Sequence, residues 1–452
     1  MRKLLPILLC GAVFTWAHTA LADDSNLASQ FQKLVGNTDP SQEDWSLHGQ
    51  ATEVVQGYPS FPASYSGQNS LSPDSQWKNT TTATLFLGRR LWEGAEVYFD
   101  PELYEGKGLQ STFGVAGFPN GEAQKNGAYD FGYGEARLFL RQVIGLGGPT
   151  EHINAGQNQL AGTEDISRIT ITAGKFAASD IFDNNSYSHD PRGQFMNWAL
   201  MESAAWDYPA NTRGYTQGFA IELNQAGWAL RYGAFMEPED PNANNLTFHG
   251  FNNIGQVAEL EERYKIADNP GKIHFLVFLN RNRGADFADA LALGGDINTA
   301  LAQERQYGNN KFGFAISAEQ QLRENVGAFA RLSWNNGATE DFMFTQVDES
   351  AALGLSIDGK MWNRPDDVFG IAGVINGISG NQQTALANGY DGIMIGDGRL
   401  NYEPEMILET YYAFSITQYA TLSPDYQLVI NPAYNADRGP VNIFAARLHL
   451  AF

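Results

Sequence analysis

Alternation of apolar and polar side chains recurs along this chain and is the feature that most constrains its fold. In the last segment, residues 441–452, Arg447 and His449 fall on one face, and the other face is apolar: Phe444, Ala446, Leu448, Leu450 and Phe452. The same alternation recurs in residues 95–100, 135–141 and 311–318. A period of two is that of a β-strand, whose successive side chains point to opposite faces. The alternation therefore predicts an all-β fold with one oily and one charged face.

The connections between the strand-patterned segments alternate in length. We place sixteen strands near 45–56, 79–88, 93–102, 133–143, 167–175, 214–223, 227–236, 256–265, 271–281, 311–320, 325–334, 350–358, 367–375, 405–415, 419–429 and 441–452. Most are close to the roughly 9–11 residues that a tilted strand needs to cross a bilayer. Long connections follow the odd-numbered strands, and most of the others are short, such as 224–226 and 268–270.

This pattern indicates a transmembrane barrel. A soluble β-sandwich shares the alternation, but an even number of strands with short turns on one side and long loops on the other is typical of an outer-membrane barrel. We therefore predict a 16-stranded antiparallel transmembrane β-barrel with short periplasmic turns and long extracellular loops, in the outer membrane of a Gram-negative cell. Two connections fit less well: 359–366 is moderately long, and 144–166 is far too long for a tight turn, so we expect a periplasmic excursion there. Helical patterns at 285–293 and 382–387 look like loop decoration.

The first 22 residues have the pattern of a secretory signal. Arg2 and Lys3 precede an apolar stretch, and residues 20–22 form an A-x-A cleavage site. We assign 1–22 to a signal peptide, 23–44 to a periplasmic N-terminal segment and 45–452 to the barrel. The only cysteine, Cys10, lies inside this signal, so the mature chain is expected to have no disulfide and no cysteine-ligated metal.

The composition of the chain argues against several classes of binding partner. The chain has 51 Asp+Glu against 29 Lys+Arg, a formal net charge of −22, which argues against nucleic acid or anionic lipid headgroups as the main partner. The histidines are scattered singly and no H-E-x-x-H, G-x-S-x-G or P-loop motif occurs, so we expect no cofactor, no metal site and no catalysis. Apolar strand faces suit outer-membrane lipid and a neighbouring protomer equally well, so a monomer and a homo-oligomer such as a trimer both remain open.

A sixteen-stranded barrel is too wide for its own side chains to fill, so it leaves an aqueous channel. The alternation assigns charged residues of both signs, together with Tyr411, to the lining: Glu96, Asp100, Arg137, Arg141, Arg168, Arg231, Glu259, Glu261, Arg263, Arg331, Glu409, Tyr411 and Arg447. Glu96, Asp100, Arg137 and Arg141 could also form an ion-pair ladder that stiffens the barrel, which is compatible with solute contact. Five aromatic residues are assigned to interfacial girdles on the oily face: Tyr215, Trp228, Tyr232, Trp334 and Tyr412.

The longest loop, 176–213, is the candidate constriction. It interleaves aromatic rings with carboxylates and amides, and its apolar rings would be costly to leave in water, so we expect it to fold into the pore. Asp180 and Asp183 are candidate solute contacts, because carboxylates accept hydrogen bonds from sugar hydroxyls; as a glycosidase pair they are weak candidates. Trp198 and Trp206 either stack on the C–H faces of a sugar or pack the loop against the barrel wall.

Five longer segments carry a resemblance to a known family. They are LFLRQVIGLGG, NSYSHDPRGQFMNWAL, AWDYPANTRGYT, GRLNYEPEMILETYY and NPAYNADRGPVNIF. The chain resembles the carbohydrate-selective porins of the OprB type from about Trp45 to Phe452. The resemblance implies passive, facilitated diffusion of glucose and similar small sugars through an outer-membrane barrel whose loops narrow the channel. The alternatives are a general or ion-tuned diffusion porin, an outer-membrane β-barrel hydrolase and a soluble all-β sugar-binding protein.

Overall fold

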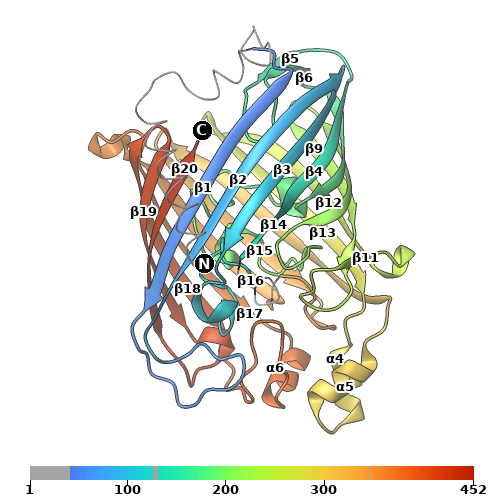
Figure 1. The fold of residues 1–452 in the computed structure, drawn as a ribbon, viewed down its shortest axis with the longest axis vertical. Coiled ribbons are helices and arrows are strands. Elements are labelled where there is room, and N and C mark those ends of the chain that lie inside the picture. The colour runs from blue at the N-terminus through green and yellow to red at the C-terminus, as the bar shows by residue number, and fades with distance from the viewer. Residues whose placement is uncertain (1–40, 126–130, 345) are drawn as a thin grey trace, which may run out of the picture.

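A closed antiparallel barrel of sixteen strands makes up most of the molecule (Figure 1). The structure is a computed structural model that describes residues 41–125, 131–344 and 346–452. Each strand pairs with its neighbour in sequence, and β1 closes the barrel by pairing with β20. The strands are β1 Trp45–Tyr58, β2 Gln76–Trp92, β3 Ala95–Glu105, β4 Phe131–Gly145, β7 Arg168–Phe176, β8 Thr216–Asn224, β9 Trp228–Phe235, β12 Ile254–Ile266, β13 Asn269–Asn282, β14 Asn309–Arg323, β15 Val326–Asn335, β16 Glu349–Asp358, β17 Val368–Gly377, β18 Glu405–Thr417, β19 Ala420–Ile430 and β20 Val441–Ala451.

The alternating pattern sets which face of each strand points into the lumen. On β20, Arg447 is fully buried inside the barrel, whereas Phe444 is 45% exposed on the outside. Trp228, Tyr232 and Trp334 are likewise exposed on the outer face, as predicted for girdle residues. The prediction of a 16-stranded antiparallel barrel is confirmed, and the predicted strand ends lie within four residues of the observed ones.

Long loops and short turns lie at opposite ends of the barrel. Figure 1 shows the loop helices α4 (Phe287–Leu293), α5 (Ile297–Glu304) and α6 (Gly380–Ala387) at one end, and the hairpin of β5 (Thr150–Ile153) and β6 (Gly162–Asp165) at the other. The helical patterns at 285–293 and 382–387 correspond to α4 and α6, while α5, capped by Asp296, lay outside the predicted segments.

The smaller elements lie in the connections. A four-residue helix, α3 (Trp198–Met201), lies in the longest loop, and the pair β10 (Glu237–Pro238) and β11 (Leu246–Thr247) lies between β9 and β12. Short 3-10 turns are η1 (Leu109–Thr112), η2 (Ala178–Asp180), η3 (Gly250–Asn252), η4 (Gly359–Trp362) and η5 (Pro432–Tyr434). The predicted signal peptide, 1–22, and most of the segment 23–44 lie outside the described residues. No helix within the described part of the chain is long and apolar enough to cross a membrane.

Candidate functional site

A ladder of ion pairs runs along the lumenal face of β3. Because side chains of a strand alternate, one face of β3 presents Glu96, Tyr98, Asp100 and Glu102 to the lumen. Glu96 is paired twice: its Oε2 is 2.7 Å from Arg141 Nη2, and its Oε1 is 3.3 Å from Arg90 Nη1. The Tyr98 hydroxyl donates to Glu96 Oε2 at 2.6 Å. The ion-pair ladder considered from the sequence is therefore present.

The ladder meets the longest loop at Arg137. We call residues 177–215, between β7 and β8, the inward loop. Arg137 donates two hydrogen bonds to Asp180 of this loop, from Nε to Oδ2 at 2.7 Å and from Nη2 to Oδ1 at 2.5 Å. Arg137 Nη1 also lies 3.6 Å from Asp100 Oδ2. Asp100 is fully buried, but the side chains of Arg137 and Asp180 are 16% and 28% exposed, so water reaches this junction of wall and loop.

Tyr215 corrects one prediction from the sequence. We assigned it to the outer aromatic girdle, but it is buried, and its hydroxyl donates to Glu102 Oε2 at 2.9 Å inside the barrel. Strand β8 begins only at Thr216, so Tyr215 belongs to the inward loop, and its side chain does not follow the in–out alternation of the strand. Arg213 donates to the same carboxylate at 2.7 Å and thereby extends the ladder to the long-loop end.

A second lumenal cluster surrounds Arg231 of β9. Its Nη1 is 2.7 Å from Glu259 and its Nη2 is 2.8 Å from Glu261, and it also pairs with Glu222. Arg263 donates to Glu261 at 2.6 Å. The two clusters together line the lumen from β2 to β12 with paired charges of both signs.

The opposite wall of the barrel binds the inward loop. Arg331 of β15 donates to the carbonyls of Leu200 and Ser188, each at 2.7 Å. Its Nε lies 3.4 Å from Asp183 Oδ1, and Asp183 in turn accepts the Ser203 hydroxyl at 2.9 Å. Arg331 and Asp183, both predicted as solute contacts, are almost fully buried and act as loop tethers in this arrangement.

Glu409 of β18 and Arg447 of β20 also bind the inward loop. Glu409 accepts the backbone N–H groups of Met196 and Asn197 at 2.5 and 2.9 Å. Arg447 donates to the carbonyl of Gln194 at 2.7 Å. Both charged side chains are fully buried beneath the loop, so Glu409, another predicted solute contact, is also placed as a tether.

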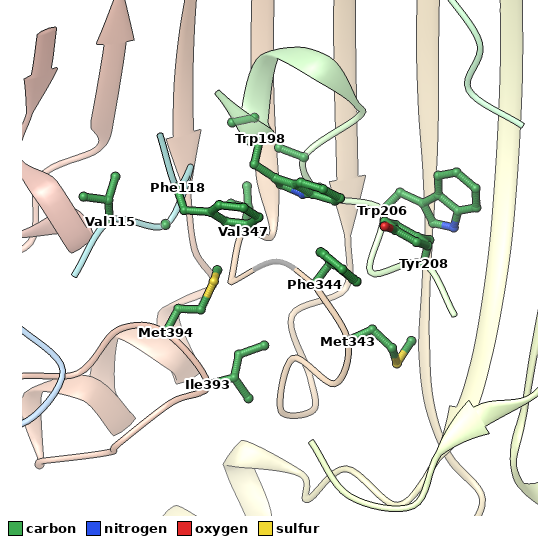
Figure 2. Packing of buried hydrophobic residues seen from close by; sticks show 14 of the residues in the cluster. Val115, Phe118, Trp198, Trp206, Tyr208, Met343, Phe344, Val347, Ile393 and Met394 are labelled. Carbon is green, nitrogen blue, oxygen red and sulfur yellow. The ribbon is translucent and has the colours of Figure 1, made fainter. Parts of the chain in front are cut away.

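An aromatic stack fills the centre of the loop packing (Figure 2). Trp198 stacks on Phe118 and Phe344, with ring centroids 5.0 and 4.5 Å apart, and Tyr208 stacks on Phe344 at 5.0 Å. Trp206 packs beside Tyr208. Trp198 and Trp206 are 3% and 1% exposed, so the structure gives both indoles the packing role, and their contact with sugar stays a prediction.

Two further carboxylates hold neighbouring loops in the lumen. Asp207 of the inward loop accepts backbone N–H groups from residues 342–344, at 2.8 to 3.3 Å. Glu405 of β18 accepts those of residues 116–117, at 3.0 and 2.8 Å. The sequence could not identify these partners, because a bond to a backbone N–H leaves no residue-type signal in the partner loop.

The two sides of the lumen therefore differ in their access to water. On the side that binds the inward loop, from β14 to β20, five lumenal charged residues are 7% exposed or less: Glu319, Arg331, Glu405, Glu409 and Arg447. On the other side the strand arginines keep 10% to 31% side-chain exposure: Arg90, Arg137, Arg141, Arg168, Arg231 and Arg263. We therefore expect the solute pathway to follow the wall of β2, β3, β4 and the neighbouring β7–β12.

The structure brings only some of the predicted site residues together. Glu96 and Arg141 share one ion pair, and Asp100, Arg137 and Asp180 meet at the junction described above. Arg168 lies apart, at the short-turn end, where it pairs with Glu151 and Glu164 of the β5–β6 hairpin. Glu102 was missed because the alternating segment that we used to assign the lining ended at Asp100, although Glu102 shares the spacing of Glu96 and Asp100.

The comparisons with known proteins identify the family. A family model described as "Carbohydrate-selective porin, OprB family" matches residues 68–452. The chain belongs to this family. With the closed sixteen-stranded barrel, this makes it an outer-membrane porin with short periplasmic turns, long extracellular loops and a lumen crossed by loops.

Two distant curated relatives and one solved structure agree with this family assignment. Porin AaxA of Chlamydia muridarum (strain MoPn / Nigg) is 20% identical over 328 residues, which cover 70% of this chain and 60% of the relative. Porin AaxA of Chlamydia abortus is 22% identical over 340 residues, covering 72% and 66%. The chain thus spans roughly three fifths to two thirds of the length of these curated relatives. A high-pH structure of Pseudomonas putida OprB superposes with a TM-score of 0.67 at 15% identity, covering 90% of this chain and 94% of that one, which supports the same fold.

No group of three or more metal-ligating side chains occurs within the described residues. The family and the barrel indicate a channel rather than an enzyme. Asp180 and Asp183, the weak glycosidase candidates, bind different arginines: Asp180 binds Arg137 on β4, and Asp183 lies beside Arg331 on β15.

Proposed function

We propose that this porin passes small neutral carbohydrates, such as glucose, across the outer membrane by passive facilitated diffusion. The observation that carries the proposal is the junction of Arg137 with Asp100 and Asp180, where a partly exposed guanidinium lies between two carboxylates on the solute pathway. A sugar hydroxyl both donates and accepts hydrogen bonds, so it can bond a carboxylate and a guanidinium at once. The family description points to the same class of solute.

The charge balance of the pathway favours neutral solutes over ions. The carboxylates of β3 are paired with arginines of β2, β4 and the inward loop, so positive and negative groups lie side by side along this wall. An ion therefore gains little from the lining, whereas a polyhydroxylated molecule can exchange bonds with water for bonds with the paired groups. Binding must stay weak, because a site that holds a solute tightly would block conduction.

The rival proposal is a general diffusion porin, with or without ion preference, whose paired charges only stiffen the barrel. Liposome swelling separates the two. Purified protein is reconstituted in liposomes, and the entry rates of glucose and of neutral solutes of similar size but fewer hydroxyls are compared, with protein-free liposomes as the control. We expect glucose to enter faster than its size predicts. If the entry rates depend on solute size alone, the sugar preference is excluded and the general diffusion porin is the better description.

A further inference from the structure

The connection between β4 and β7 does not turn beneath the barrel but re-enters it. After β5 and before β6, the segment 154–161, here called the hairpin tip, bends back into the lumen. Leu160 is 2% exposed, and its N–H donates to the Tyr98 hydroxyl at 3.1 Å. Gln157 Nε2 donates to Gln50 Oε1 of β1 at 3.1 Å. The tip thus contacts lumenal residues of two strands from the periplasmic side.

Asn158 shows how far the tip reaches. Its Nδ2 donates to Asp100 Oδ2 at 2.8 Å. Asp100 lies five residues beyond Ala95, where β3 begins, and at about 3.3 Å per residue this is about 16 Å along the strand. Asp100 is also the carboxylate beside Arg137, so the hairpin tip from one side and the inward loop from the other meet at the same pair.

Two acceptors at this meeting point have no donor. Asp100 Oδ1 and Asn158 Oδ1 are buried, and neither has a hydrogen-bond partner within the described residues. The orientation of the Asn158 amide follows from its bond to the carboxylate, because only Nδ2 can donate, and this leaves Oδ1 as a free acceptor. Asn158 and Arg137 keep partial exposure, so the two buried acceptors lie directly beneath side chains that water reaches. Buried acceptors call for a donor, which a hydroxyl group supplies.

We propose that the hairpin tip is the periplasmic half of the constriction, and that Asp100 and Asn158 form a subsite there that accepts hydroxyl hydrogens from a neutral polyhydroxylated solute. Arg137 borders this subsite and can donate to a solute oxygen. The proposal rests on the proposed function and specifies where the solute is held. The two negative charges of Asp100 and Asp180 exceed the single positive charge of Arg137. The subsite therefore disfavours anionic sugars such as uronates and sugar phosphates.

Asn158→Gly is the sharpest variant. Asn158 has a φ of 54°, in the left-handed region that glycine adopts readily, so the change removes the side chain without straining the backbone. His152→Ala is the matched control, because His152 is exposed on the same hairpin. Heat-modifiable migration in gel electrophoresis checks that each variant forms a barrel.

Single-channel recording in planar bilayers then measures ion conductance and its block by glucose and by glucuronate. For Asn158→Gly we expect a higher conductance and a half-blocking glucose concentration raised at least threefold, with His152→Ala unchanged. In the wild type we expect weaker block by glucuronate than by glucose. Unchanged conductance and unchanged glucose block in Asn158→Gly would overturn the proposal and leave the proposed function standing.

A wild type that glucose does not block, and that shows no sugar preference in swelling, would overturn the proposed function and the subsite with it. A rise in conductance without any change in glucose block would also overturn the subsite, because the tip would then be a size barrier only. Asp100→Asn is a second variant, which keeps the shape and the acceptor but removes the charge; it should reduce the discrimination against glucuronate.

Discussion

Arg137 of β4 and Asp180 of the inward loop are joined by two parallel hydrogen bonds, from Nε to Oδ2 at 2.7 Å and from Nη2 to Oδ1 at 2.5 Å. This geometry is specific to a guanidinium and a carboxylate, and it fixes orientation as well as distance. Asp180 Oδ2 also accepts the N–H of Ala177, so the start of the inward loop is fixed to the wall through one side chain. The pair therefore holds the first residues of the inward loop against β4.

Removal of Arg137 should change selectivity more than stability. Arg137→Ala leaves Asp100 and Asp180 without their shared cation, so the junction becomes more negative. We expect cation permeability relative to anions to rise severalfold, measured as a reversal potential across a KCl gradient, with a stronger effect at low salt. Arg137→Lys keeps the charge but not the two-bond geometry, so its ion selectivity should stay near wild type while glucose flux falls.

Lys360→Ala is the control for this pair of variants, because Lys360 is exposed in a periplasmic turn and its removal changes the net charge equally. Arg141→Ala should have a smaller effect than Arg137→Ala, since Glu96 keeps Arg90 as a partner. Unchanged ion selectivity and glucose flux in both Arg137→Ala and Arg141→Ala would remove these arginines from the filter.

Much of the barrel could be predicted from the sequence, because one face of each strand meets lipid and the other meets polar groups. The position of Arg137 and Asp100 on the lumenal face follows from that alternation alone. The loops follow no such period. Asp207 bonds backbone N–H groups of residues 342–344, and Asn158 reaches Asp100 across 58 residues of sequence, so neither contact has a local signature. Tyr215 was misplaced for the same reason, because it lies one residue outside its strand.

Loss of the Glu409 tether should loosen the inward loop without unfolding the barrel. Glu409 accepts two backbone N–H groups of the loop, and each bond of this kind contributes about 1 kcal/mol. We expect Glu409→Ala to raise single-channel conductance and current noise and to expose the loop to trypsin. Glu409→Gln keeps one acceptor oxygen and should lie between wild type and Glu409→Ala. If the conductance and the current noise of Glu409→Ala both equal those of the wild type, Glu409 does not act as a tether.

Variants of Trp198 distinguish packing from sugar contact. Trp198→Phe keeps an aromatic ring in the stack with Phe118 and Phe344, whereas Trp198→Ala leaves a cavity, a change that costs about 3–5 kcal/mol at well-packed sites. If packing is the role of Trp198, conductance should rise and become noisy in Trp198→Ala and stay close to wild type in Trp198→Phe, with glucose block following the same order. Reduced glucose block in Trp198→Phe at unchanged conductance would instead support stacking of the indole on sugar.

The packing of the inward loop should weaken as pH rises, because of Glu202. This side chain is 3% exposed, and its Oε2 has no hydrogen-bond partner within the described residues. Burial, and secondarily the nearby Asp183 carboxylate, raises the pKa of Glu202 from 4.5 to about 8. A raised pKa means that the packed loop holds the proton more tightly than the unpacked loop does. The packed state is therefore favoured fully below pH 4.5 and loses that advantage as pH rises to about 8.

Current noise and trypsin cleavage of the loop, measured from pH 5 to pH 9, should therefore increase up to about pH 8 and then level off. Glu202→Gln keeps the shape of the side chain but cannot ionise, so its profile should be flat at the low-pH level of the wild type. Glu403→Gln, at an exposed loop carboxylate, should keep the wild-type profile. A pH response that survives in Glu202→Gln would assign it to another group, since the substituted side chain carries no proton to release.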